Sequence, residues 1–246
     1  MKRATDVICV FRIQLAGMRR EVGPFLLAAL VFPAAMYLFA NAVSGVGINQ
    51  EQNPLRFLAG SIVFSLSLSS ISWLGYLLLE NRFTGRLKLF ATLPLAPSSY
   101  VFGVLVFALA QAAVGTTALL LVGRAIGVKM RPNFPLLGVV ILLTILCLCG
   151  LAVVVAAWAR SFTQGALLTD TLGAGLIFLA PIYYAPEMMP RALRLFAQLL
   201  PTTFAAHAVQ TTLAGGHAIG GELFALGLMA VATLALGFRL MQWREN

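Results

Sequence analysis

The sequence predicts an all-α polytopic membrane protein with six transmembrane helices, an N-terminal amphipathic interfacial helix and a re-entrant outer cap before the last helix. Of the 246 residues, 60% are hydrophobic and only 10% are charged, whereas about 25% of the residues of a soluble domain are charged. The mean hydropathy is +0.93. Six apolar runs have the length of about 20 residues that a helix needs to cross the bilayer: residues 22–42, 57–79, 98–122, 134–159, 165–184 and 219–240.

These runs favour helices over a barrel, because backbone groups in lipid must be paired internally and the runs do not alternate strictly between apolar and polar residues. The first run ends in Ala40-Asn41-Ala42, a pattern typical of a leader cleavage site. The run is longer than the apolar core of a leader, so we expect it to remain as a membrane span.

Residues 1–21 are expected to form a helix that lies flat at the inner surface of the membrane. At 100° per residue, apolar side chains gather on one face and basic side chains on the other. The residues that define this interfacial helix are Phe11, Arg12, Leu15, Met18 and Arg19. Gly23 and Pro24 then supply a turn, and Pro33 predicts a kink in the first span.

Two features inside the spans are candidates for a translocation path. The second span carries Ser61, Ser65, Ser69 and Ser72 along one helical face, which is typical of a packing seam between helices and also suits a polar path. Asp170, in the fifth span, is the acidic residue at greatest membrane depth. An intramembrane carboxylate is a functional candidate, but this one lies about 9 Å along the helix from Gln164, near the inner end of the span.

Residues 80–97 form a short charged loop between the second and third runs, and residues 185–216 form a second irregular segment before the last run. The second segment is too apolar for an ordinary loop and is interrupted by prolines and glycines, which predicts short re-entrant helices dipping into the outer leaflet. The residues that define this outer cap are Pro186, Pro190, Pro201 and Gly215.

The distribution of Lys and Arg predicts that both termini are cytoplasmic, because that side carries 11 of the 17 basic residues. The loop of residues 123–133, with three basic residues, departs from this pattern. The net charge of +9 is explained by positive-inside sorting and by anionic lipid headgroups, and no basic stripe with interleaved aromatic residues indicates nucleic acid.

The sequence lacks the motifs of an enzyme. It contains no G-x-S-x-G, no H-E-x-x-H and no G-x-x-x-x-G-K-[ST], and its two histidines, His207 and His217, fall in the predicted outer segment. The cysteines Cys9, Cys147 and Cys149 are expected to be free thiols. Energy from ATP would therefore have to come from another subunit.

Taken together, these features resemble the permease subunits of ABC-2 type exporters over nearly the whole chain. Glu80, Gly85 and the Thr92-Leu93-Pro94-Leu95 turn are similar to the acidic residue, glycine and Thr-x-Pro-like turn of that family. Residues 186–215 are similar to its proline-rich outer segment, although Leu200 and Gln210 stand where the family has Asn and Arg.

The resemblance implies a single transmembrane domain, residues 1–246, in a bacterial cytoplasmic (inner) membrane, paired with a second permease copy as a homodimer. Two copies of a P-loop ATP-binding subunit would hold ATP and Mg, and this chain would bind no cofactor or metal. The residues implied to couple to that partner are Glu80, Arg82, Gly85, Arg86, Leu87, Lys88, Phe90, Leu93 and Pro94.

The apolar, aromatic and hydroxyl surface of the spans suits a hydrophobic or amphipathic substrate, such as a drug, polyketide, lipid or glycolipid. Two alternatives remain open. An ion-coupled secondary transporter or channel is disfavoured by the scarcity of ionisable groups in the spans, and a structural membrane subunit without transport would make the loop of residues 80–97 dispensable.

Overall fold

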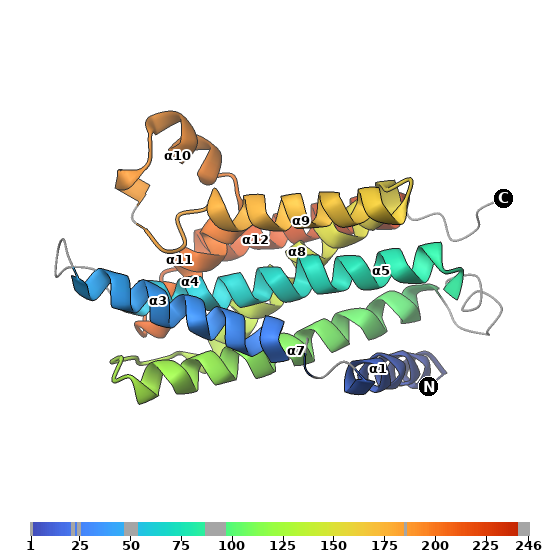
Figure 1. The fold of residues 1–246 in the computed structure, drawn as a ribbon, viewed down its shortest axis with the longest axis horizontal. Helices are drawn as coiled ribbons and strands as arrows, with labels where there is room; N and C mark the ends of the chain where they lie inside the picture. The colour runs from blue at the N-terminus through green and yellow to red at the C-terminus, as the bar shows by residue number, and fades with distance from the viewer. Residues whose placement is uncertain are drawn as a thin grey trace.

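The computed structural model describes residues 2–20, 23, 26–46, 54–86, 97–184 and 186–240, and within these ranges the chain is helical with no strand. In chain order the elements are α1 (Lys2–Arg20), the π-helix η1 (Leu27–Val31), α3 (Phe32–Val46), α4 (Pro54–Ser67), the π-helix η2 (Leu68–Trp73), α5 (Leu74–Phe83), α7 (Pro97–Ala125), α8 (Phe134–Trp158), α9 (Phe162–Phe178), the 3₁₀-helix η3 (Pro186–Met188), α10 (Arg191–Ala197), α11 (Pro201–Leu213) and α12 (Gly220–Leu240). Figure 1 shows the long helices lying lengthwise in one elongated bundle.

Four helical stretches of the described chain are long and apolar enough to cross a membrane: Pro54–Phe83, Phe102–Ala125, Phe134–Trp158 and Gly220–Gly237. They correspond to the second, third, fourth and sixth predicted spans. The first predicted span includes residues that the structure does not describe, and the fifth corresponds to α9, which is 17 residues long and ends at Phe178 rather than at the predicted residue 184. A multi-pass membrane protein is confirmed, and the count of six remains a prediction.

The boundaries of α8 and α9 follow from local capping. The Asn133 side chain accepts a hydrogen bond from the Leu136 N–H, and Pro135 occupies the first turn of α8, where its missing N–H costs nothing. Ala159 ends α8 in an extended conformation, and Ser161 then caps α9 by accepting from the Gln164 N–H at 3.2 Å. Ser161 thus fixes the start of α9 directly after α8 ends.

The helices pack closely where small residues meet. On α8, Gly150 faces Thr233 and the backbone of Leu234 on α12, and on α12 Gly237 faces Val153 on α8. Small residues let membrane helices approach to backbone contact. The α8–α12 pair is therefore held by close packing rather than by long side chains.

Two helices contain π-helical turns, which the sequence does not predict. The segment η1 ends two residues before Pro33, where a kink is predicted, and η2 interrupts the long helix formed by α4 and α5. The two π segments contact each other. Such insertions mark places where the hydrogen-bond ladder of a helix shifts register.

The amphipathic helix α1 packs against α7 rather than standing apart from the bundle. Val10 is buried beside Gly103, and the Phe11 and Phe107 rings lie 6.2 Å apart with an edge-on geometry. Part of the predicted apolar face of α1 thus contacts protein. On the two predicted faces, the apolar Leu15 is half-buried and the basic Arg12 is exposed. The side chains of Met18 and Arg19 lie outside the described part, and placement of α1 at the lipid surface remains a prediction.

The segment of the predicted outer cap has two different parts. The helix α10 projects at the end of the bundle opposite α1 and the C-terminal end of α5 (Figure 1). The helix α11, which begins at Pro201, packs between α4, α8 and α12. The Thr202 hydroxyl donates to the Leu176 carbonyl at 2.6 Å, which ties the start of α11 to α9.

Candidate functional site

The predicted coupling loop begins with a defined helix end. The Thr84 N–H and hydroxyl both donate to the Glu80 carbonyl, at 2.9 and 2.6 Å, and close the last turn of α5. Gly85 follows with φ of 76°, a left-handed conformation that favours glycine at the residue after a helix. Five predicted coupling residues lie outside the described part of the chain: Leu87, Lys88, Phe90, Leu93 and Pro94.

Arg82 joins the base of this loop to a neighbouring helix. One guanidinium nitrogen, Nη1, donates to the carbonyls of Ala156, Ala157 and Ala159 at 2.6, 3.0 and 2.9 Å. These carbonyls lie at the C-terminal end of α8, where a helix leaves acceptors unpaired and carries partial negative charge. The Arg82 cation therefore caps α8, so α5 and α8 are tied together beside the loop.

A second bond joins the two sides of the loop itself. The Asn81 side-chain amide donates to the Tyr100 hydroxyl at 2.9 Å, and both residues are buried. Asn81 lies at the end of α5 and Tyr100 at the start of α7, so the bond spans the base of the loop. We name Asn81, Arg82 and Tyr100 the loop clasp. Arg82 is among the predicted site residues, but Asn81 and Tyr100 are not. The sequence feature that could have indicated Asn81 is its amide side chain next to Glu80, at the end of an apolar run.

Glu80 and Arg86 form an ion pair on the outside of this clasp. Arg86 Nη1 lies 3.0 Å from Glu80 Oε1, and both side chains are about half exposed. Exposed pairs of this kind contribute little to stability, in general about 0–1 kcal/mol. Their position at the helix end leaves the pair accessible to a partner.

The serine row lies mostly inside the bundle. Ser61, Ser65 and Ser69 are buried, and Ser72 is partly exposed. The Ser61 hydroxyl lies 3.4 Å from the Tyr183 hydroxyl, and the Ser69 hydroxyl donates to the Leu66 carbonyl at 3.1 Å. Within one chain these contacts serve packing, and a role of the row in translocation remains a prediction.

Asp170 does not face this buried row. Its side chain is exposed and accepts a hydrogen bond of 2.6 Å from the Tyr76 hydroxyl, which joins α9 to α5. The Tyr76 ring lies 6.4 Å from that of Phe162. The carboxylate thus has a partner within the chain, and the structure does not bring Asp170 together with Ser61, Ser65 and Ser69.

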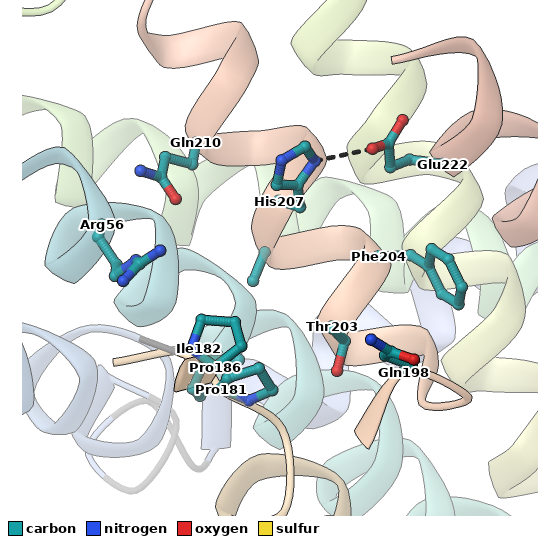
Figure 2. A pocket seen from close by; sticks show the side chains of 11 residues that line it. Arg56, Pro181, Ile182, Pro186, Gln198, Thr203, Phe204, His207, Gln210 and Glu222 are labelled. Carbon is teal, nitrogen blue, oxygen red and sulfur yellow. Dashed lines mark ion pairs between the residues drawn. The ribbon is translucent and has the colours of Figure 1, made fainter. Parts of the chain in front are cut away.

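At the opposite end of the bundle a cavity of about 460 Å³ opens between α4, α11, α12, the segment after α9 and the residue that follows α10. Figure 2 shows the side chains that line it, with His207 between Arg56 on one side and Glu222 on the other. His207 Nδ1 lies 2.7 Å from Glu222 Oε1, a contact that joins α11 to α12. The sequence places His207 in the predicted outer segment but does not predict this cavity, because the cavity walls come from five separate segments.

Apolar helices of spanning length place the chain in the class of multi-pass membrane proteins, and no cluster of potential metal ligands occurs in the described residues. A family model described as ABC-2 type transporter matches residues 7–214. The match covers most of the chain, so the chain belongs to the ABC-2 type transporter family. Members of this family supply the transmembrane permease component and not the ATPase. A comparison with curated proteins found no match.

Proposed function

We propose that the chain is the permease subunit of an ATP-driven exporter and forms the path for a hydrophobic or amphipathic substrate. Two P-loop ATP-binding subunits power it, and two copies of the chain form a homodimer in a bacterial cytoplasmic membrane with the termini in the cytoplasm. Family membership supports the transporter class. The observation that carries the coupling role is the loop clasp, which ties α5, α7 and α8 together beside the exposed Glu80–Arg86 pair.

The clasp suggests how a partner would drive the helices. A subunit that pushes on the loop of residues 80–97 would move α5 and α7 through Asn81 and Tyr100, and α8 through Arg82. Because these helices are packed into one core cluster, they would shift as a unit. Rigid-body rotation and the shear of packed helices are recurring forms of switching transition in proteins.

The coupling role is tested with the double variant Glu80→Ala/Arg86→Ala. The complex should still assemble and hydrolyse ATP, because the pair is exposed and contributes little to folding. Export should fall at least several-fold, because the proposed contact with the ATPase subunit is lost. The matched control is Arg124→Ala, an exposed cation at the far end of α7. Unchanged export in the double variant, at equal membrane insertion, would contradict the proposal.

The nature of the substrate is tested by ATPase stimulation. The reconstituted complex is exposed to lipids, glycolipids and amphipathic drugs, and stimulation by at least one of these classes is expected. Conductance or uptake by the chain in liposomes without ATP would favour the channel or ion-coupled carrier instead.

A further inference from the structure

The cavity opposite the coupling loop carries charges of both signs close to an apolar wall. Within the part of the chain that the structure describes, its charged or ionisable lining residues are Arg56, His207 and Glu222. Its apolar lining consists of Pro181, Ile182, Pro186, Phe204 and Ala206. A volume of about 460 Å³ lies within the range of about 300–1,000 Å³ that is typical of small-molecule sites.

In the described part of the chain, several polar side chains that line the cavity form no hydrogen bond or ion pair that would stabilise the fold. Among the described residues, those of Arg56, Gln198 and Gln210 have no hydrogen bond or ion pair. Arg56 lies in the first turn of α4, where the helix dipole adds to its positive charge. By contrast, the Thr203 hydroxyl is committed to the Ala197 carbonyl at 2.6 Å. The free guanidinium and amides are therefore available to a ligand.

The charges limit what that ligand can be. A purely anionic group on Arg56 would leave the Glu222 carboxylate of the same cavity without a cationic partner from the ligand, and a purely cationic group on Glu222 would leave the Arg56 guanidinium without an anionic one. A headgroup with a phosphate and an ammonium satisfies both. The phosphate would bind Arg56, with Gln210 as an additional donor, and the ammonium would bind the second oxygen of Glu222.

The helix beside the cavity indicates where the rest of the ligand lies. On α10 and the turn after it, Leu195, Phe196 and Leu199 are 67%, 52% and 69% exposed, and Gln198, between them in the chain, lines the cavity. An exposed apolar surface of this kind at the end of a spanning bundle favours insertion into lipid at headgroup depth. Acyl chains beside α10 would place their headgroup at the opening of the cavity.

We propose that this cavity binds the zwitterionic headgroup of an amphiphile of the phosphatidylethanolamine type, with phosphate on Arg56 and ammonium on Glu222. That this amphiphile is the transported cargo rests on the proposed function, whereas its binding to the cavity does not. Binding is therefore measured on the purified full-length chain without any ATPase subunit.

The first test uses the unaltered chain and native mass spectrometry. Dioctanoyl phosphatidylethanolamine is expected to bind about tenfold more tightly than dioctanoyl phosphatidylglycerol, which lacks the ammonium, and at least tenfold more tightly than dioctanoylglycerol. Inorganic phosphate and phosphoethanolamine, which lack acyl chains, are expected to compete weakly. Competition by phosphate as strong as by the lipid would show a simple anion site and overturn the proposal, as would equal binding of all the lipids.

The second test identifies the residue that binds the phosphate and the residue that binds the ammonium of the headgroup. Arg56→Gln should weaken phosphatidylethanolamine binding about tenfold, and Glu222→Gln should reduce it to the level of phosphatidylglycerol. His207→Gln leaves the Glu222 carboxylate in place and puts an amide donor beside it. This variant should therefore still prefer phosphatidylethanolamine over phosphatidylglycerol. The matched controls are Arg124→Gln and Glu187→Gln, two exposed residues that do not line the cavity. Thermal unfolding checks that each variant is folded, and undiminished binding in folded Arg56→Gln and Glu222→Gln would overturn the proposal.

Discussion

At the scale of single residues, polar side chains in this chain hold neighbouring helices at their ends. The family resemblance implies that Arg82 couples to a partner subunit, and this role remains a prediction. In the structure its guanidinium also caps the carbonyl end of α8. Sequence spacing could not reveal this contact, because the acceptors are backbone atoms more than 70 residues away.

The capping role of Arg82 predicts a loss of stability on truncation. Arg82→Ala removes the charge-assisted contacts that one guanidinium nitrogen makes with three carbonyls and should lower the free energy of unfolding by about 2 kcal/mol. A drop in the thermal unfolding midpoint in detergent measures the effect. Arg86→Ala is the matched control, because its guanidinium is exposed and should change stability by less than about 1 kcal/mol. Equal midpoints for the two variants would rule out the cap.

At the scale of elements, apolar runs locate the long helices well. The fourth run is predicted at residues 134–159 and the helix is Phe134–Trp158, while the last run is predicted at 219–240 and the helix is Gly220–Leu240. The π segments η1 and η2 were not predictable, because a shifted hydrogen-bond ladder leaves the apolar character of the run unchanged. The division of the outer cap into a projecting α10 and a packed α11 depends on neighbours far away in the chain.

The close contact of α8 and α12 predicts opposite effects at two glycines of one helix. A Cβ at Gly150 would clash with Thr233 Oγ1 and lie 2.9 Å from the Leu234 backbone nitrogen, so Gly150→Ala should cost about 1–3 kcal/mol. A Cβ at Gly138 would meet nothing within 4 Å, so Gly138→Ala should be neutral or stabilise by up to about 1 kcal/mol. Thermal unfolding of both variants measures the difference, and a loss at Gly138 as large as at Gly150 would contradict this packing.

At the scale of the whole molecule, the two ends of the bundle have different chemistry. One end carries the loop clasp and the exposed Glu80–Arg86 pair, and the other carries α10 and the charged cavity (Figures 1 and 2). The sequence predicts the multi-pass class and the loop, since both follow from hydropathy and local charge. It does not predict the cavity, because Arg56, His207 and Glu222 come together only when α4, α11 and α12 are packed.

The ATP-hydrolysing partner that we propose would bind at the loop end of the bundle, and photocrosslinking tests this placement directly. Phe83, exposed at the end of α5, and Phe134, exposed at the start of α8 on the opposite end, are each replaced by photoreactive benzoylphenylalanine in cells that express the whole complex. After irradiation, we expect an adduct with a P-loop ATPase subunit from position 83 and none from position 134. An adduct from position 134 alone would contradict the proposed placement of the partner. ATP-dependent export by a complex that gives no ATPase adduct from position 83 would contradict it as well.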